Sequence, residues 1–249
     1  MDAPLLQIKD VKKYFPVKKV RGGEDIAVKA VDSIDLTINS GEIVGLVGES
    51  GCGKSTLGKS ILKLYDITEG QILFHGEDIT NYTEKQMHPL REKIQIIFQD
   101  PYASLNPKKK IVQSVMAPLN ATKKYTKEEK LQKVIAILNE VGLDEKYLEK
   151  YPHEMSGGQR QRVVIARALI NDPELVVCDE PVSALDVSVR SQVLNLLKDL
   201  QKSRNLTYIF ISHDLSVVEY LCDKVAVMYL GRIMEYADKK HLFGNPLHP

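Results

Sequence analysis

Residues 48–55 read Gly48-Glu49-Ser50-Gly51-Cys52-Gly53-Lys54-Ser55, and this stretch decides how the chain is interpreted. It fits the pattern GxxxxGK[ST] and follows the apolar run Ile43 to Val47, which predicts a strand buried on both faces of a parallel sheet. Thr56 to Leu64 is predicted to form the helix beyond the loop. Strand, glycine-rich loop and helix in this order favour a phosphate-binding loop over a plain glycine-rich turn.

Each residue type in such a loop has a physical task. Glycines let backbone N–H groups converge on phosphate oxygens, and the N-terminus of the following helix adds the positive end of its dipole. Lys54 is predicted to reach the β- and γ-phosphate oxygens, and the Ser55 hydroxyl is predicted to ligate Mg²⁺. The predicted phosphate-binding residues are Gly48, Glu49, Ser50, Gly51, Cys52, Gly53, Lys54, Ser55 and Thr56.

A pair of carboxylates follows a second apolar run. Asp179 and Glu180 end the strand predicted at Leu175 to Cys178, which places them at the carboxyl edge of a parallel sheet, where α/β proteins bind ligands. Asp179 suits Mg²⁺ and Glu180 suits the attacking water. Acidic residues also begin many ordinary loops, so the phosphate loop is what favours the functional interpretation.

The segment Ser156-Gly157-Gly158-Gln159 precedes a predicted helix through residues 163–169. Ser156 can cap this helix, and the two glycines admit an anion close to the backbone. By itself the segment could be only a helix cap. The chain already has one predicted phosphate loop, so a second anion-binding helix N-terminus needs a separate explanation in the geometry of the protein.

The rest of the pattern predicts an α/β fold with two additions. Apolar alternation at Leu6 and Ile8, and again between Val28 and Ile38, predicts an antiparallel edge sheet, with Pro16 to Ile26 as a solvated loop. Tyr208 to Ile211 is a third buried run.

The stretch from about residue 102 to 172 is helical and strand-poor in pattern. Thr126 and Glu129 form a capping box, Leu131, Val134 and Leu138 keep helical spacing, and Gly142 stands at the C′ position. These residues predict a helical lobe inserted into the α/β domain.

Composition excludes several classes of protein. The 249 residues, 43% of them hydrophobic, can bury the core of one large domain, and 34 basic against 33 acidic residues favour no nucleic-acid partner. No apolar run of about 18 residues and no apolar signal-peptide core is present, so we expect a cytosolic chain. Cys52, Cys178 and Cys222 form no CxxC pair, which predicts buried or incidental thiols.

Ser156 to Gln159 resembles the signature motif of ABC-family ATPases, and further segments match that family in order from Tyr14 to about Glu235. Tyr14 resembles the aromatic residue that stacks on adenine, with Phe15 as the alternative one position on. Gln99 matches the Q-loop glutamine, Ser183-Ala184-Leu185-Asp186 the D-loop, and His213 the switch histidine.

The resemblance implies a site for ATP and Mg²⁺ shared between two subunits that meet head to tail. The implied catalytic residues are Lys54, Gln99, Glu180 and His213, and the implied metal ligands are Ser55, Gln99 and Asp179. The resemblance implies that Ser156, Gly158 and Gln159 act in trans, with Asp186 near the seam, and that the other site residues act in cis: Lys54, Ser55, Gln99, Asp179, Glu180 and His213. Tyr14 and Gly157 are further implied nucleotide-binding residues.

The implied partners are a second ABC ATPase subunit, in a homodimer or a paralogous heterodimer, and separate transmembrane permease subunits. An extracytoplasmic substrate-binding protein takes part indirectly. The chain is then expected at the cytoplasmic face of the cell membrane, with Asp100 to Leu105 as the candidate contact with a permease.

Within the family, VGESGCGKST, FQDPYASLNP and DEPVSALDVSVRSQVLNLL resemble the ATPases of dipeptide and oligopeptide importers, and KKYFPVKK favours the F-type subunit. The expected layout is one ABC ATPase domain, 1–249. Its RecA-like core and β subdomain take residues 4–100 and 173–235, its helical subdomain takes 101–172, and 236–249 begin a truncated C-terminal extension. That branch usually carries a cysteine cluster farther on, so no iron–sulfur cluster is assigned here.

Two other classes remain as alternatives. A soluble ABC-type ATPase acting on ribosomes or DNA commonly has two cassettes or a long coiled-coil insertion, and this sequence has neither. A non-hydrolysing regulatory cassette is disfavoured by the presence of Glu180 and His213.

Overall fold

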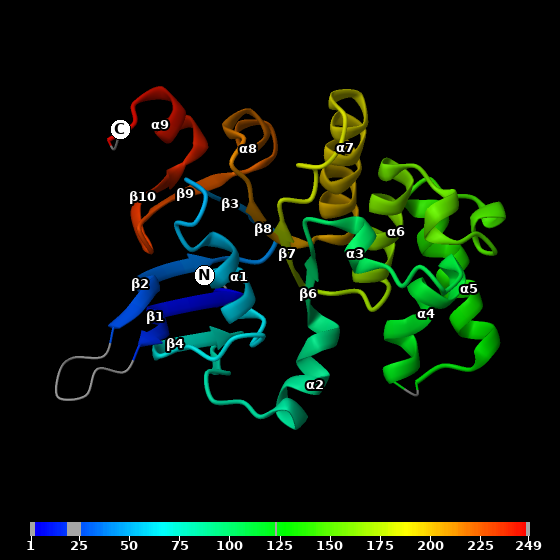
Figure 1. Cartoon of the computed structure of the whole chain (residues 1–249), viewed down its shortest axis with the longest axis horizontal. Coiled ribbons are helices and arrows are strands. Elements are labelled where there is room, and N and C mark those ends of the chain that lie inside the picture. The colour runs from blue at the N-terminus through cyan, green and yellow to red at the C-terminus, as the bar shows by residue number, and fades with distance from the viewer. Residues whose placement is uncertain (1–2, 19–25, 123, 248–249) are drawn as a thin grey trace. The chain divides into compact units, whose positions relative to one another are not determined.

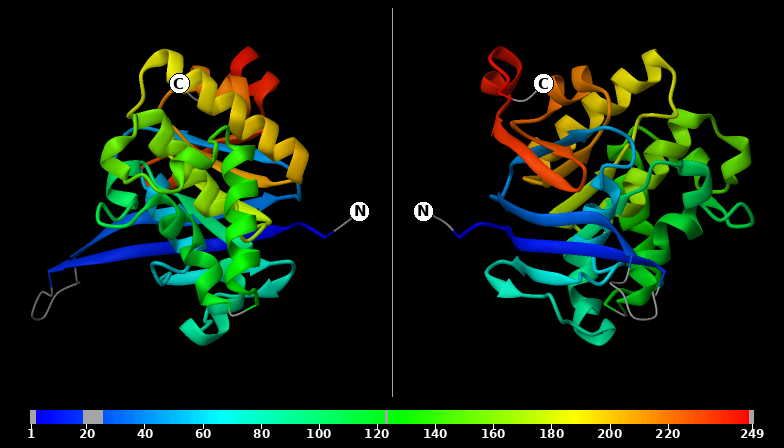
Figure 2. Two further views of the ribbon diagram at one scale, coloured as in Figure 1. Left: turned by 90° about the vertical axis from the view of Figure 1, so that its right-hand side faces the viewer. Right: turned by 60° about the vertical axis from the view of Figure 1, so that its left-hand side comes forward.

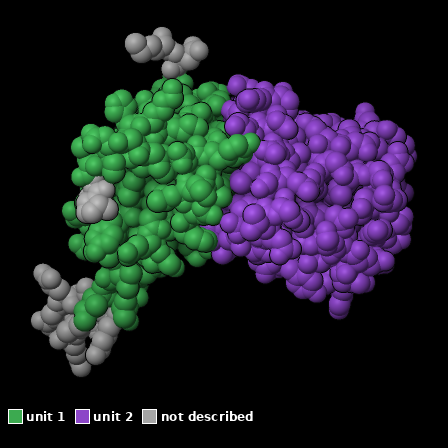
Figure 3. All heavy atoms as spheres, turned by 90° about the horizontal axis from the view of Figure 1, so that it is seen from above, with its two compact units in different colours: residues 1–91, 207–249 green, residues 92–206 purple. Residues whose placement is uncertain are grey.

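The computed structural model describes residues 3–18, 26–122 and 124–247, and the chain divides into two compact units, coloured green and purple in Figure 3. Unit 1 is discontinuous and comprises residues 1–91 and 207–249, whereas unit 2 is the single segment 92–206. The chain passes from unit 1 to unit 2 at the end of helix α2 (Glu84–Lys93).

Unit 1 contains a four-stranded antiparallel sheet in the order β2-β1-β4-β5. Leu6 pairs with Ile38 and Ile8 with Leu36, and all four side chains are buried because residues two apart in a strand share one face. The ribbons of β1 and β2 run side by side in both views of Figure 2. The four strands are β1 (Leu6–Lys18), β2 (Ile26–Ile38), β4 (Glu69–Phe74) and β5 (Glu77–Asp78).

This sheet confirms the predicted antiparallel sheet but corrects the loop between its first strands. Pro16 to Lys18 continue β1 and Ile26 already begins β2, where Pro16 pairs with Ala27. The glycines and lysines of residues 16–26 favoured a loop. Pairing between β1 and β2 nevertheless extends the strands into both ends of that segment. The remainder of the predicted loop, residues 19–25, lies outside the described residues.

A second set of strands in unit 1 follows the order β10-β9-β3-β8 (Figure 1). β3 is parallel to both β8 and β9, and residues 43–47 are all buried, as the apolar run predicted. β9 and β10 form an antiparallel hairpin that the sequence interpretation did not include. The elements are β3 (Ile43–Gly48), β8 (Thr207–Ile211), β9 (Lys224–Tyr229), β10 (Arg232–Asp238), α8 (Leu215–Leu221) and α9 (Lys239–Gly244).

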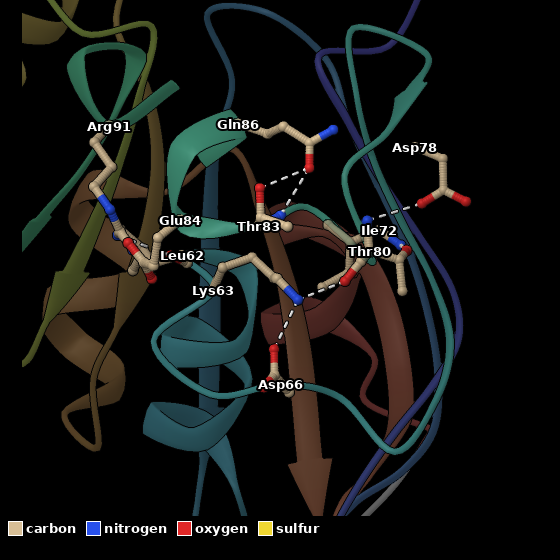
Figure 4. Close-up of polar contacts among 10 residues, drawn as sticks. All are labelled: Leu62, Lys63, Asp66, Ile72, Asp78, Thr80, Thr83, Glu84, Gln86 and Arg91. Carbon is tan, nitrogen blue, oxygen red and sulfur yellow. Dashed lines mark hydrogen bonds and ion pairs between the residues drawn. The ribbon is translucent and has the colours of Figure 1, made fainter. Parts of the chain in front are cut away.

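Helix α1 (Lys54–Ile61) begins two residues before, and ends three residues before, the predicted helix. It stops because Lys63 takes a positive φ of 53°, which a right-handed helix cannot continue through. Figure 4 shows the Lys63 ammonium between its two acceptors, Asp66 Oδ1 at 2.8 Å and the Thr80 carbonyl at 2.5 Å. Thr80 Oγ1 in turn accepts from the Ile72 N–H in β4, so the end of α1 is fastened to the antiparallel sheet.

Unit 2 is mainly helical, as predicted for residues 102–172, and the described part of that stretch contains no strand. Two parallel strands flank it in sequence, with Ile97 of β6 opposite Cys178 of β7. Its elements are β6 (Ile94–Ile97), α3 (Pro101–Ser104), α4 (Ile111–Ala121), α5 (Lys127–Glu140), η1 (Glu145–Tyr147), η2 (Pro152–Glu154), α6 (Gly157–Leu169), β7 (Leu175–Asp179) and α7 (Val187–Arg204).

Helix α5 has the predicted ends. Thr126 Oγ1 accepts from the Glu129 N–H at 3.2 Å, the Glu129 carboxylate accepts from the Thr126 N–H at 2.7 Å, and Gly142 has a φ of 76°. Val134 and Leu138 are buried, whereas Leu131 is exposed. The capping box and the C′ glycine thus determine where α5 begins and ends, although Leu131 is not buried.

Two further findings bear on sequence predictions. Across residues 3–18, 26–122 and 124–247, none of the helices is both long and apolar enough to cross a membrane. Cys52, Cys178 and Cys222 are all buried, as expected, and burial raises the pKa of the Cys222 thiol to about 12.

Candidate nucleotide-binding site

The loop between β3 and α1 is held in place by close backbone contacts at two glycines. Gly48 has a φ of 147° and Gly53, the N-cap of α1, has a φ of 108°. A Cβ atom at Gly48 would lie 2.1 Å from the Met228 carbonyl oxygen, and one at Gly53 would lie 1.9 Å from the Ala30 carbonyl oxygen. Only glycine fits these positions, so the strands β9 and β2 fix the path of the loop.

Lys54 extends across this loop. Its side chain is buried, with 6% exposure, and its ammonium donates to the carbonyl oxygens of Gly48 and Glu49, each at 2.8 Å. The Cys52 sulfur lies 3.6 Å from the same nitrogen. A cation at the centre of a loop that ends in a helix N-terminus is suited to phosphate oxygens.

His213 lies beside the same loop, although it is far away in sequence. It follows β8, and it lines a pocket of about 590 Å³ together with residues 48–50. The remaining wall is apolar and consists of Val47, Leu215, Val227, Leu242, Phe243 and Pro246. Helix α9 supplies part of this wall, which no pattern in the sequence indicated.

In unit 2 the structure brings together two of the predicted catalytic residues. β6 and β7 are parallel neighbours, so Gln99 after β6 and Glu180 after β7 leave the same edge. The Gln99 amide Nε2 donates to Glu180 Oε2 at 3.1 Å. Glu180 has a positive φ of 49°, and its carbonyl oxygen accepts from the N–H and the hydroxyl of Ser183, which begins the predicted D-loop.

The predicted Mg²⁺ ligands fit a hard cation by the chemistry of their donor atoms. Ser55 offers a hydroxyl in the first turn of α1, Asp179 a buried carboxylate at the end of β7, and Gln99 an amide oxygen. Among the described residues no group of three or more His, Cys, Asp or Glu side chains could hold a metal. Mg²⁺ is commonly bound by one or two protein oxygens plus phosphates rather than by an all-protein cage.

The segment Ser156 to Gln159 begins α6 through a complete capping box. Ser156 Oγ accepts from the Gln159 N–H at 3.3 Å, and Gln159 Oε1 accepts from the Ser156 N–H at 3.0 Å. The Gln159 amide Nε2 also donates to the phenolic oxygen of Tyr147 in η1, at 2.9 Å. Sequence reasoning predicted the Ser156 cap but missed the return bond from Gln159 and the tyrosine beyond it.

The two glycines of this segment have different surroundings. A Cβ at Gly157 would lie 3.5 Å from Leu185, an ordinary contact, whereas one at Gly158 would lie 2.4 Å from Val189 Cγ1. A side chain at Gly158 would therefore displace Val189 where α6 packs against α7. A polar pocket of about 300 Å³ lies beside this segment and is lined by Ser156, Gly158, Tyr147, Gln159, Arg162 and Gln192.

Asp186, the last residue of the predicted D-loop, is exposed at the N-cap of α7.

Tyr14 and Phe15, the two candidate adenine contacts, are both half-buried in β1 but have different partners. The Tyr14 hydroxyl donates to Asp32 in β2, which raises the pKa of the phenol. The Phe15 ring packs edge-on against Tyr65 at 5.6 Å. Hydrogen bonds from Tyr14 and Arg232 hold the pKa of Asp32 below its usual value.

The candidate permease contact, Asp100 to Leu105, is only partly available at the surface. Asp100 caps α3 by accepting from the Tyr102 N–H at 2.7 Å, and the Tyr102 side chain is 52% exposed. Leu105 is 2% exposed, so it packs in the core and drops out of the predicted contact. The contact was predicted from the position of the segment directly after Gln99, which does not indicate which of its side chains are buried.

A family model described as ABC transporter matches residues 31–183, which include the phosphate loop, Gln99, the capped start of α6 and the two carboxylates. The chain belongs to the ABC transporter family. Membership makes it an ATP-binding and ATP-hydrolysing protein, and the α/β fold with its parallel strands agrees with this assignment.

Curated relatives match almost the whole chain. The oligopeptide transport ATP-binding protein AppF of Bacillus subtilis (strain 168) is 52% identical over 247 residues, which cover 98% of this chain and 75% of that protein. The dipeptide transport ATP-binding protein DppF of Escherichia coli (strain K12) is 48% identical over 249 residues, 100% of this chain and 75% of that protein.

Solved ABC cassettes have the same fold. The dimeric ATP-binding cassette MJ0796, bound to ADP and Pi in a post-hydrolysis state, has a TM-score of 0.81 at 29% identity, over 94% of this chain and 98% of that one. CbiO1 from Clostridium perfringens, part of the ABC transporter complex cbiONQ, has a TM-score of 0.83 at 30% identity, over 98% and 92% of the two chains.

Proposed function

We propose that this ABC ATPase drives an importer of dipeptides or oligopeptides. The observation that carries the proposal is identity of about half the residues, over nearly the full chain, to relatives named for oligopeptide and dipeptide transport. The relatives reported above are named for transport, so nothing favours the alternative of a soluble ATPase acting on ribosomes or DNA.

In the proposed hydrolytic site, Lys54 binds phosphate and three oxygen donors bind Mg²⁺. The Lys54 ammonium would bind the β- and γ-phosphates, because it already bridges the carbonyl oxygens on the inner side of the loop. Mg²⁺, when bound, neutralises the phosphate charge, and Ser55, Asp179 and Gln99 would hold it.

Glu180 would orient the attacking water, since a carboxylate at this strand end can accept its proton. The Gln99 amide donates to the Glu180 carboxylate at 3.1 Å, so a Gln99 that also held Mg²⁺ would contact both the metal and the base. His213, beside the start of the phosphate loop, would hydrogen-bond the γ-phosphate. Tyr14 would stack on adenine.

We also propose that Ser156, Gly157, Gly158 and Gln159 serve the nucleotide of a second subunit, with Asp186 near the seam. The capping box leaves the remaining N–H groups of the first α6 turn for an anion, with the positive end of the helix dipole behind them. The second subunit would be another copy of this chain or a paralogous ATPase.

Crosslinking tests this arrangement directly. A chain with Ser156→Cys and Lys54→Ala, which we expect to bind nucleotide poorly in its own loop, is mixed with a Glu180→Gln chain and a thiol-reactive ATP analogue. Label on the cysteine in the mixture supports a site shared between subunits. Equal labelling of the cysteine chain alone, in demonstrably monomeric protein, contradicts it.

The proposed partners are transmembrane permease subunits at the cytoplasmic face of the membrane, with an extracytoplasmic peptide-binding protein acting through them. Tyr102, exposed on α3, is the proposed contact with a permease. The test is co-expression with candidate peptide-importer permease subunits, purification from detergent-solubilised membranes, and ATPase assay in proteoliposomes. Peptide-dependent stimulation supports peptide import, whereas a chain that never co-purifies with membrane subunits contradicts it.

A further inference from the structure

Asp32 is a buried carboxylate at the centre of a small network in unit 1. It lies in β2 with 7% exposure and accepts from the Tyr14 hydroxyl of β1. Arg232, the first residue of β10, donates to the same carboxylate through Nη2 at 2.7 Å and Nε at 3.1 Å. A carboxylate this buried is tolerated because three donors share its charge.

The same network reaches the phosphate loop through the turn between β9 and β10. The Gly231 carbonyl oxygen accepts from the Asp32 N–H at 2.8 Å, and the Gly231 N–H donates to the Cys52 carbonyl oxygen at 3.0 Å. Gly231 therefore bonds both the loop, at Cys52, and the backbone N–H of Asp32, the residue whose carboxylate holds the tyrosine.

Strand register also places the backbone of Tyr14 opposite the part of β2 that contacts the loop. Tyr14 lies opposite Lys29, and the next residue, Ala30, is the one whose carbonyl oxygen abuts Gly53. A half-buried aromatic ring thus sits one strand away from the phosphate loop, with its hydroxyl end fixed. A tyrosine tethered at its hydroxyl cannot swing about χ1 without breaking that bond.

We infer that Asp32 and Arg232 are positioning residues that hold the Tyr14 ring at a set distance from the phosphate loop, so that one nucleotide is gripped at both ends. This inference rests on the proposed function, in which Tyr14 takes the base. Pre-organising the ring lowers the entropy lost when the base binds, which appears as affinity for the base alone. The phosphates are bound by the loop and are unaffected.

The experiment compares ATP with inorganic triphosphate, which has the phosphates and no base. Tyr14→Phe removes the hydroxyl and keeps the ring, and Asp32→Asn removes the charge and keeps the shape. From the usual net contribution of one hydrogen bond, we expect ATP affinity to fall about three- to tenfold in calorimetry, with unchanged affinity for inorganic triphosphate.

Lys224→Gln is the matched control. It breaks a half-buried ion pair of the same unit, Lys224 Nζ to Glu42 Oε1 at 3.0 Å, at the end of β9 away from the loop. We expect it to bind both ligands as the parent does. Thermal unfolding of every variant, followed by circular dichroism, confirms that the proteins compared are folded.

Two outcomes overturn the inference: an equal loss of affinity for both ligands, which makes the network a support for the loop alone, or no loss for either. Tyr14→Ala separates this failure from that of the proposed function. If Tyr14→Ala weakens ATP while Tyr14→Phe and Asp32→Asn do not, only the positioning role is wrong. If Tyr14→Ala binds ATP normally, the base contact itself is wrong.

Discussion

Alanine substitution at two glycines of the phosphate loop separates backbone conformation from close packing. Gly51 and Gly53 both have positive φ, 81° and 108°. A Cβ at Gly51 meets no protein atom within 4 Å, whereas one at Gly53 would lie 1.9 Å from the Ala30 carbonyl oxygen. The contacting atom is a backbone oxygen of β2, so it cannot move away by a change of side-chain rotamer.

The magnitudes follow from these contacts. A left-handed conformation costs an L-residue about 1–2 kcal/mol at either position. At Gly53 an overpacking cost of about 1–3 kcal/mol adds to this, for a total of about 2–5 kcal/mol. At about 2–4 °C per kcal/mol, Gly51→Ala should lower Tm by about 2–8 °C and Gly53→Ala by about 4–20 °C.

The assay is thermal unfolding of both variants without nucleotide, followed by calorimetric titration with ATP. Gly53→Ala should be the less stable of the two, and its loop should bind ATP more weakly because the contact with β2 must open by more than about 1 Å. If both variants unfold at the same temperature and bind ATP equally, the argument that β2 fixes the loop is refuted.

Three further outcomes are expected. Glu180→Gln should keep ATP affinity and lose at least about 10²-fold in turnover, because the base is lost and the phosphate contacts stay; parental ATPase rates would contradict the role of Glu180. The lowered pKa of Asp32 stabilises the fold above its unfolded value of about 3.9, and this contribution is lost as pH falls through the lower folded pKa. Below about pH 4, Tm should therefore fall more steeply in the parent than in Asp32→Asn, and parallel curves would count against the network. Cys222, with its pKa raised by burial to about 12, should react with iodoacetamide at pH 8 only as fast as the protein unfolds, as mass spectrometry can measure.

Features encoded over a few neighbouring residues could be predicted from the sequence. The run at residues 43–47, the loop after it and the capping box at Thr126 each specify structure through local periodicity or hydrogen bonding, and the structure has all three. Glu180 was predicted from its place after an apolar strand and Gln99 from the family pattern, and the pairing of two parallel strands is what brings them into contact.

Features that depend on distant contacts could not be predicted. Tyr147 belongs to no motif, and only folding places its hydroxyl against Gln159. Arg232 and Asp32 are separated by 200 positions, and nothing in either local pattern indicates that they pair. Leu105 was included in the predicted permease contact because the segment follows Gln99, and burial of a single apolar residue after a short helix leaves no periodic signal.

Because unit 1 is discontinuous, its first segment is synthesised well before the strands with which it pairs. β3 ends in the phosphate loop, and its two neighbours in the sheet are β8 and β9, which reach residue 229. At roughly 5–20 residues per second, about 9–36 s separate the synthesis of Gly48 from that of its register partner Met228. Until β8 is synthesised at residues 207–211, the ribosome holds an apolar strand with neither lateral partner made, while the contiguous segment 92–206 is completed. A nascent chain halted between these points should expose β3 to proteases and to chaperones that bind extended apolar segments.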